Sequence, residues 1–349
     1  MRMRLPVEPG RRLSQLARVL SLLSAALGLL VAVLVGQLLG PAPPRPTVRP
    51  DEATDGPPPP GSYHRAAFSA PDTASIPPTA AGRTIRYGRA LVASTAQYLG
   101  PGGSVGHFTN GMNCQNCHLA AGTLGFANNY LAVAATYPRR RARSGTVEGI
   151  ARRVADCMER SLNGRAVPDS SREMRAIVAY IKWLGQGIAK GQKVYGTGLM
   201  PLAYLRRAAD PLVGRAVYAS KCQRCHGPTG QGQPLASGRG YQYPPLWGAA
   251  SYNDGAGLYR VSSLARFVKA AMPFGASFAQ PQLTDAQAWD VAAFINSQPR
   301  PHLPMPQDWP DVSQKPVDYP FAPYADGFSA RQHKYGPFQP IEAAHANPL

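Results

Sequence analysis

The chain has 349 residues, enough for two domains of ordinary size, and 44% of them are hydrophobic, so it can bury real cores. Charged residues make up only 16%, while 35 glycines and 36 prolines favour compact helical units joined by irregular chain. The net charge of +18 favours anionic partners, and the sequence carries no nucleic-acid-binding motif, so we expect no nucleic acid among them.

Residues 1–40 are predicted to be a membrane anchor or a signal sequence. Five arginines lie within the first 18 residues, and an uncharged run follows from Val19 to Leu39, about long enough to cross a bilayer. The run is longer than a typical signal-peptide core and lacks a good small-residue cleavage site, which favours an uncleaved helix. The arginines predict a cytoplasmic N-terminus, so we expect a periplasmic protein tethered to the inner membrane.

Residues 41–71 are rich in proline and include the run Pro57–Pro60. Proline disrupts helix and sheet interiors, so this segment is expected to be an extended, semi-rigid linker. It would hold a globular head away from the membrane.

Residues 72–190 and 191–300 form two units with the same order of features. Each is predicted to open with a helix, pass through a C-x-x-C-H sequence and close with a second helix. The opening segments, Thr84–Val92 and Asp210–Tyr218, share a Gly-Arg-Ala core. In the first unit a closing helix is expected around Ser171–Leu184, where apolar residues recur at helical spacing.

The closing helix of the second unit is expected to begin at Thr284 or Asp285, either of which can cap it, and to run through Phe294. We expect no long strands in either unit, because no alternating apolar–polar run of useful length occurs. Residues 301–349 contain many prolines but also many aromatic residues, which are rare in disordered chain. They are therefore expected to form an irregular but ordered C-terminal strap.

Each C-x-x-C-H sequence predicts a covalent haem site. Two thiols at this spacing form thioethers with the vinyl groups of haem, and the histidine that follows becomes the proximal iron ligand. The residues are Cys114, Cys117 and His118 in the first unit and Cys222, Cys225 and His226 in the second. The alternatives are a zinc site, which needs further ligands at matching spacing, and a redox dithiol, which does not need the histidine. We expect two haem c groups.

Each haem iron needs a sixth ligand. In the second unit the best candidate is Met272, because the proline and glycine after it end the helix there; Met200 is the reserve. In the first unit the corresponding position holds Cys157, with Met158 and Met174 as alternatives. Met174 lies on the apolar face of the closing helix, so we expect it in the core.

Cys157 lies on a predicted helix from Val147 to Leu162. Arg153, Cys157 and Ser161 are spaced four apart, so they share one face, with Arg160 one step round. Residues 139–175 contain ten arginines and five acidic residues, and nearby cations lower the pKa of a thiol. The alternative is a buried cysteine acting as a small hydrophobic residue. An iron that lacks a ligand and an arginine cluster that can bind an oxyanion favour a functional thiolate.

Several longer segments carry a family resemblance. They are Cys114–Leu119, Tyr137-Pro138 with the arginines that follow, Arg153–Ser161, the second C-x-x-C-H, Ala270–Pro273 and His333–Phe338. Over about residues 80–340 the chain resembles the tetrathionate-forming thiosulfate dehydrogenases, a family of dihaem c-type cytochromes. The cysteine-centred segment and the tail are far more specific than a C-x-x-C-H sequence alone.

The resemblance implies a mainly α fold with two tandem class I cytochrome c-like domains, each binding one covalent haem c. It implies that two thiosulfates are coupled to one tetrathionate at a haem ligated by His118 and Cys157. Arg153 and Ser161 match substrate-pocket positions, and Arg143 matches more loosely. Electrons would pass through a second haem, ligated by His226 and Met272, to a periplasmic or membrane acceptor such as another cytochrome or a terminal oxidase. Some members have a lysine before the matching methionine; this chain has Ala271, which favours constant His/Met ligation.

Two other functions fit part of the sequence. A membrane-tethered dihaem cytochrome that only transfers electrons would explain both haems but not Cys157 among its arginines. A Sox-type sulfur-carrier cytochrome also uses a cysteine-ligated haem, and would turn over only with a carrier protein.

Overall fold

The computed structural model describes residues 18, 20–30, 69–192 and 194–346. The chain divides into two units, residues 1–49 and residues 50–349. In the first unit the described residues 20–30 are helical and exposed. Among all described residues, no helix combines the length and the apolar character needed to cross a membrane. Most of the predicted anchor and nearly all of the predicted proline-rich linker lie outside the described residues.

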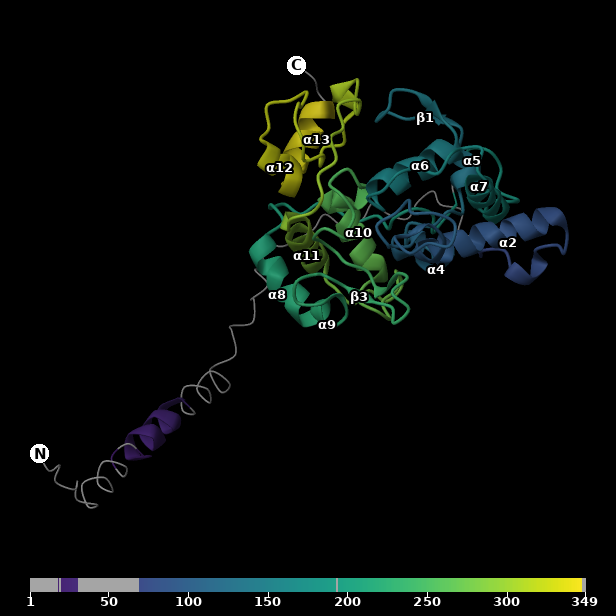
Figure 1. Cartoon of the computed structure of the whole chain (residues 1–349). Helices are drawn as coiled ribbons and strands as arrows, with labels where there is room; N and C mark the ends of the chain where they lie inside the picture. The colour runs from purple at the N-terminus through teal and green to yellow at the C-terminus, as the bar shows by residue number, and fades with distance from the viewer. Residues whose placement is uncertain (1–17, 19, 31–68, 193, 347–349) are drawn as a thin grey trace, which may run out of the picture. The chain divides into compact units, whose positions relative to one another are not determined.

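The first half of the second unit is built from short helices and one pair of strands (Figure 1). The helices are α2 (Ala80–Ala93), α3 (Thr95–Leu99), α4 (Leu119–Gly122), α5 (Val133–Thr136), α6 (Ile150–Arg160) and α7 (Arg172–Leu184), with the 3-10 turns η1 (Thr73–Ser75) and η2 (Cys114–Asn116). The strands β1 (Arg139–Arg140) and β2 (Val147–Glu148) pair antiparallel.

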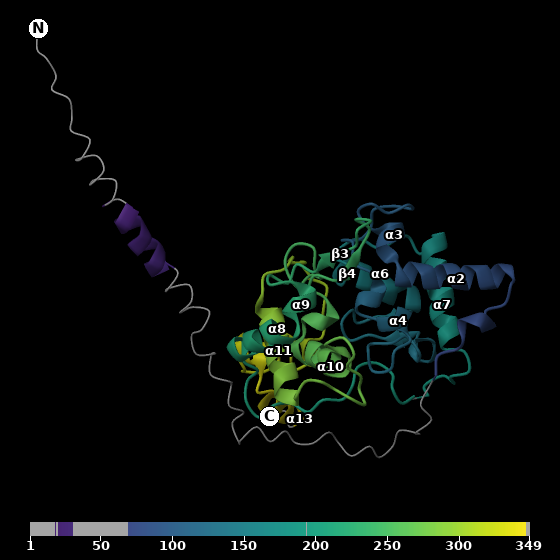
Figure 2. The same ribbon diagram turned by 90° about the horizontal axis from the view of Figure 1, so that it is seen from below.

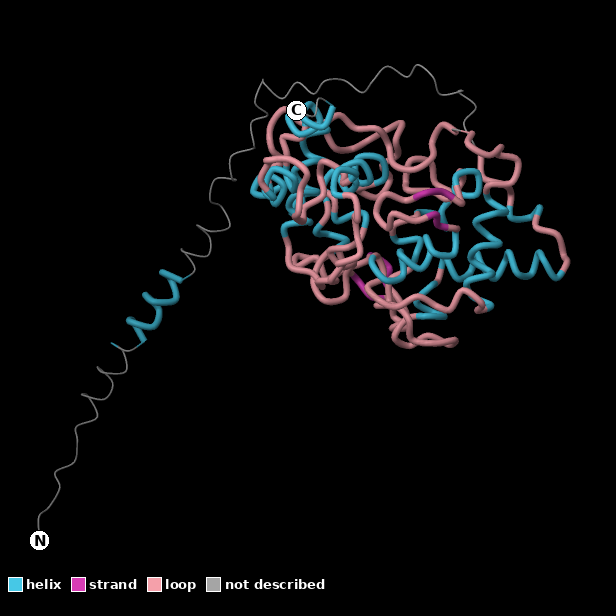
Figure 3. Tube along the Cα trace, turned by 90° about the horizontal axis from the view of Figure 1, so that it is seen from above, coloured by secondary structure: helices cyan, strands magenta, loops and turns pink. Residues whose placement is uncertain are grey.

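The second half repeats this plan and then continues into the C-terminal strap. Its elements are α8 (Pro211–Lys221), α9 (Gln223–His226), β3 (Gln233–Pro234), β4 (Tyr241–Tyr243), η3 (Gly257–Tyr259), α10 (Val261–Ala271) and α11 (Asp285–Ser297). The strap adds η4 (Val312–Gln314), α12 (Ala330–Tyr335) and α13 (Gln339–Ala346). Figure 3 shows helices joined by long loops, with strands confined to short stretches. The mainly α fold is therefore confirmed.

Each half is organised around one pair of helices, α2 with α7 and α8 with α11 (Figures 1 and 2). A glycine from the shared Gly-Arg-Ala core lies at each crossing. A Cβ atom on Gly88 would lie 1.9 Å from the carbonyl oxygen of Ala176, and one on Gly214 would lie 1.9 Å from that of Asp290. The backbones therefore approach closely because these positions carry no side chain.

Replacing Gly88 or Gly214 with alanine is expected to lower the free energy of unfolding by about 3 kcal/mol, because the added methyl group meets backbone that must shift as a whole. The thermal unfolding midpoint of the holoprotein measures the effect. Gly102→Ala is the matched control, since a Cβ atom there would have no heavy atom within 4 Å. Equal midpoints for Gly88→Ala and Gly102→Ala would contradict this account of the crossing.

The closing helices begin where their caps predict. The Ser171 side chain accepts a hydrogen bond from the Met174 backbone nitrogen at the start of α7. Thr284, rather than Asp285, caps α11, in a reciprocal capping box with Gln287. The hydroxyl oxygens satisfy backbone N–H groups that have no partner inside the helix, which fixes the first turn.

Each half has its own hydrophobic core. The first contains buried residues from Ile76 to Leu184, including Met112, Met158 and Met174. The second is centred on α8, α10 and α11, and it also takes in Phe338 and Ile341 from the strap. The strap therefore contributes to the second core.

Two elements differ from the sequence prediction. The helix carrying Cys157 begins at Ile150 rather than Val147, because Val147 and Glu148 pair with β1. The strap was expected to be irregular, yet α12 and α13 form within it. Ser329 caps α12 by accepting a hydrogen bond from the Gln332 backbone nitrogen. Packing of Phe338 and Ile341 against the second core stabilises this part of the strap, whose helices the proline-rich composition did not predict.

Candidate active site

Both C-x-x-C-H sequences adopt a single tight turn. The His118 backbone nitrogen donates to the Cys114 carbonyl at 3.0 Å, and the His226 nitrogen donates to the Cys222 carbonyl at 3.0 Å. Such a turn brings two thiols and an imidazole within reach of one porphyrin. The two sites therefore have the same local geometry.

The imidazoles are oriented as iron ligands require. Nδ1 of His118 donates to the carbonyl oxygen of Asn128, and Nδ1 of His226 donates to that of Pro244 at 2.8 Å. Burial lowers the pKa of His118 to about 4 and also lowers the pKa of His226, so both rings are neutral. A neutral ring that donates through Nδ1 presents the lone pair of Nε2 to a metal, and the carbonyl strengthens that ligand. These residues fit haem.

The thiols fit the alternatives poorly. Burial raises the pKa of Cys114 to about 11, of Cys117 to about 12 and of Cys222 to about 11. A redox dithiol needs a thiolate, which a lowered pKa would favour. Within the described residues, no cluster of three or more His, Cys, Asp or Glu side chains is arranged to hold a metal ion by itself.

The segment between α7 and α8 holds the loop that orients His118. The Phe126 nitrogen donates to the Gly196 carbonyl at 2.7 Å, and the Asn128 nitrogen donates to the Gly198 carbonyl at 2.9 Å. The Asn129 side chain donates to Gly196 as well, at 2.6 Å. Gly196 and Gly198, which belong to the predicted second domain (residues 191–300), therefore support the Asn128 loop whose carbonyl accepts the hydrogen bond from His118.

Helix α6 and the first C-x-x-C-H sequence face one cavity of about 240 Å³. Cys117 and His118 line it together with Arg153, Cys157 and Ser161. Arg143 and Arg160 line it too. Every site residue predicted for substrate is therefore brought to the cavity that Cys157 shares with His118.

The two methionine alternatives for the first iron lie elsewhere. Met158 and Met174 are each 1% exposed and belong to the first core, and neither lines the cavity. For Met174 this position in the core was expected from the sequence. Met158 follows Cys157 directly in sequence, but one step along a helix turns its side chain about 100° away from the cavity.

Arg153 is the electrostatic partner of Cys157. The Cys157 sulfur in its ionised form is the first cause of the raised pKa of Arg153, ahead of the opposing effect of burial. No ion pair between Arg153 and a carboxylate is present in the described part of the chain. Its guanidinium therefore lines the cavity as a cation that interacts with the candidate reactive sulfur.

The other arginines of the cavity are partnered. Arg143 and Arg160 share the carboxylate of Asp308, at 3.8 Å and 2.8 Å. The remaining pairs are Arg141 with Glu148 and Arg260 with Asp318. Residues 139–175 carry +5 by sequence, and Asp308 from the strap offsets part of that charge. Asp318, also from the strap, pairs with Arg260 instead. Sequence reasoning missed both strap carboxylates, Arg141 and Arg260, because no local spacing connects them with α6.

Met272 ends helix α10, as the following Pro273 predicted. It is half-buried and packs against the second core, which Cys222 also contacts. His226 is buried and held by Pro244. The assignment of Met272 as ligand of the second iron stays a prediction.

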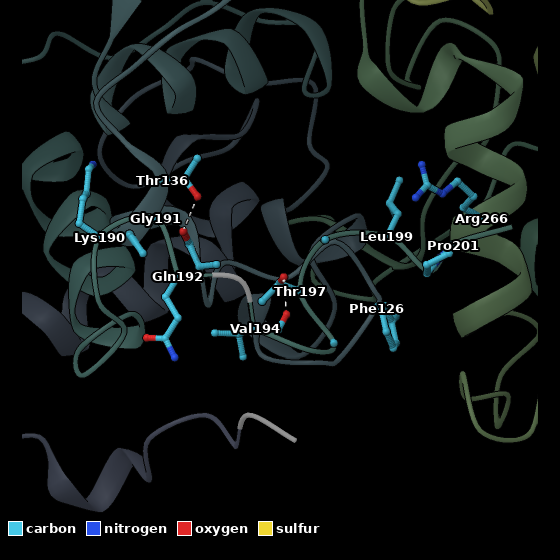
Figure 4. A pocket seen from close by; sticks show the side chains of 14 residues that line it. Phe126, Thr136, Lys190, Gly191, Gln192, Val194, Thr197, Leu199, Pro201 and Arg266 are labelled. Carbon is cyan, nitrogen blue, oxygen red and sulfur yellow. Dashed lines mark hydrogen bonds between the residues drawn. The ribbon is translucent and has the colours of Figure 1, made fainter. Parts of the chain in front are cut away.

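A larger cleft, of about 670 Å³, lies beside the segment between α7 and α8 (Figure 4). Phe126, Lys190, Thr197 and Arg266 line it, with no residue of either C-x-x-C-H sequence. It shares only Leu199 with the cavity of Cys157. We place the chemistry in the smaller cavity, because only that one is lined by titratable sulfur and by an imidazole poised to bind iron.

Comparisons with known proteins agree with this geometry. Residues 106–189 match the SoxA/TsdA cytochrome c domain family, and residues 213–299 match the cytochrome c family. The chain is similar to the thiosulfate dehydrogenase of Stutzerimonas stutzeri, with 36% identity over 68% of this chain and 74% of that protein. It is similar to that of Allochromatium vinosum, with 39% identity over 67% of this chain and 85% of that protein.

Among solved structures, the chain is similar to the as-isolated thiosulfate dehydrogenase (TsdBA) of Marichromatium purpuratum. The TM-score is 0.63 with 32% identity, and the match covers 68% of this chain. This chain spans half the length of that solved chain.

Proposed function

The chain belongs to the thiosulfate dehydrogenase family of dihaem c-type cytochromes, and we propose that it couples two thiosulfates into one tetrathionate at Cys157. Its mainly helical body contains two cytochrome c domains, which implies haem c. The observation that carries the proposal is the cavity shared by His118, Cys157 and Arg153. A pure electron-transfer cytochrome needs no such thiol beside a cation.

Two haem groups fit the chain. Cys114 and Cys117 would hold the first through thioethers, with His118 and Cys157 as iron ligands. The second would be held by Cys222 and Cys225, with His226 and Met272 as iron ligands. Each bound haem accepts one electron at a time, so two of them can take both electrons of the reaction.

The proposed chemistry runs through the Cys157 sulfur. A first thiosulfate forms a bond between its outer sulfur and the Cys157 thiolate, and two electrons leave, giving a cysteine S-thiosulfonate. A second thiosulfate attacks the sulfur that carries the sulfonate. The S–S bond of tetrathionate forms, the bond to Cys157 breaks, and the thiolate is restored. Overall, two dianions become one dianion and two electrons.

The surrounding side chains offset repulsion between the dianions. Arg153 faces the Cys157 sulfur and would bind the sulfonate oxygens of the first substrate through charge-assisted hydrogen bonds. Ser161, one turn further along, adds a hydroxyl donor. Arg143 lines the same cavity from the loop after β1 and would serve the second thiosulfate.

Turnover of purified holoprotein with thiosulfate and an artificial electron acceptor tests the function. We expect reduction of the acceptor and one tetrathionate for every two thiosulfates consumed, without any added protein. A pure electron-transfer cytochrome would give no thiosulfate-dependent reduction, and a sulfur-carrier cytochrome would turn over only with its carrier. Either result would overturn the proposal.

The location and the acceptor are also proposed. Haem c attachment and the arginine-led hydrophobic run of residues 19–39 favour a periplasmic protein tethered to the inner membrane. Electrons would leave through the second haem to another cytochrome or a terminal oxidase.

A further inference from the structure

We propose that Asp308, on the C-terminal strap, is a positioning residue that holds Arg143 and Arg160 at the catalytic cavity. The inference rests on the proposed function, because it concerns how that cavity binds thiosulfate. Asp308 is not itself assigned a contact with substrate. It would act only through the two arginines.

The three side chains form one buried cluster. Arg160 donates to both oxygens of Asp308, through Nη1 at 2.9 Å and Nη2 at 2.8 Å. Arg143 Nε lies 3.8 Å from the same carboxylate. The side chains of Arg143, Arg160 and Asp308 are 14%, 13% and 10% exposed. Because one carboxylate serves two guanidinium groups, the cluster keeps one positive charge for an incoming anion.

Neighbouring strap residues restrict Arg143 further. Its guanidinium lies 5.4 Å from the ring centre of Trp309 and 5.8 Å from that of Tyr319. Its Nη1 donates to the Gly255 carbonyl at 3.0 Å, and the Trp309 backbone nitrogen donates to the Arg143 carbonyl at 2.6 Å. Arg143 is thus fixed from several sides before any substrate arrives, which lowers the cost of ordering it on binding.

The two cations would separate without the carboxylate. Burial is the first cause of the lowered pKa of Arg143, and repulsion from Arg160 is the second. Like charges that share one largely buried carboxylate repel strongly, and Asp308 is the only carboxylate that either arginine pairs with in the described part of the chain. The distance between the two guanidinium groups is therefore set by a residue from the far end of the sequence.

Asp308→Asn keeps the shape of the side chain and removes its charge. We expect kcat/KM for thiosulfate to fall about 100-fold, mainly through a higher KM, because two displaced guanidinium groups no longer meet the anion together. Asp311→Asn is the matched control. Asp311 lies on the same strap and caps η4, but its carboxylate bonds to Ser313 and Gln314 and pairs with neither Arg143 nor Arg160 in the described part of the chain, so we expect a change of no more than about twofold.

Two further measurements separate positioning from a general loss of structure. The ratio of haem to protein and the low-spin EPR spectrum should match wild type in Asp308→Asn. In an Arg160→Gln background, Asp308→Asn should cost only about threefold, because its effect passes largely through Arg160. Fully additive losses in this double-mutant cycle would overturn the proposal.

Asp308→Glu provides a second variant should Asp308→Asn fail to fold. It keeps the charge but moves the carboxylate by one methylene, so we expect KM to rise about tenfold. An unchanged KM would show that position does not matter and would overturn the inference. Wild-type protein that lacks thiosulfate turnover would instead defeat the proposed function, so the two failures are distinguishable.

Discussion

Cys157→Ala is expected to lower thiosulfate turnover by at least about three orders of magnitude while leaving both haem groups attached. In the proposed mechanism, Cys157 supplies the sulfur that forms a bond to the first thiosulfate and is released as thiolate when the second thiosulfate attacks. The substitution removes that sulfur. Alanine has the highest helix propensity, so helix α6 should form as in wild type, and the substitution changes neither C-x-x-C-H turn. Turnover is measured with an artificial electron acceptor, and haem content is measured per protein chain.

EPR spectroscopy gives the same variant a readout independent of turnover. Oxidised wild-type protein should show one low-spin signal of thiolate–imidazole type and one of His/Met type. In Cys157→Ala only the first should disappear. A wild-type spectrum with His/Met-type signals alone would rule out Cys157 as an iron ligand, and a variant that turns over at the wild-type rate would rule it out as the reactive sulfur.

Arg153→Gln is expected to lower kcat/KM for thiosulfate by about two to three orders of magnitude. Arg153 is the cavity arginine that forms no ion pair with a carboxylate in the described part of the chain, and it lines the cavity together with Cys157. It is therefore best placed to offset charge as a dianion approaches that sulfur. Glutamine keeps hydrogen-bonding groups and much of the length but removes the charge. The loss should shrink as ionic strength rises, because salt weakens the attraction that wild type provides.

Arg175→Gln supplies the control for net charge. Arg175 belongs to the same arginine-rich stretch but is exposed on α7, and its guanidinium donates to the Ser170 carbonyl. We expect its kcat/KM to stay within about twofold of wild type. Equal losses in the two variants would mean that the overall positive charge, rather than Arg153, attracts thiosulfate.

Much of the site could be predicted because its chemistry is local in sequence. Both C-x-x-C-H turns need only five adjacent residues, so their spacing alone predicted the haem sites. The 3.6-residue period placed Arg153, Cys157 and Ser161 on one face of a helix, although β-pairing moved the start of that helix to Ile150. Caps such as Ser171 and Thr284 marked helix starts because they satisfy backbone groups within three residues.

Only the tertiary structure decided which charges the cavity keeps. The arginine count of residues 139–175 predicted a strongly positive site, but Asp308, which pairs with Arg143 and Arg160, comes from the strap, more than a hundred residues further along the chain. Asp318 of the strap pairs with a further cavity arginine, Arg260. This pairing leaves no sequence period, since an ion pair depends on distance through space. The strap is held beside Arg143 by contacts such as the hydrogen bond from the Trp309 backbone nitrogen to the Arg143 carbonyl. The sequence by itself determined which groups can react. The fold decided which of them face the same cavity and which of their charges remain uncompensated, because these depend on contacts between distant segments.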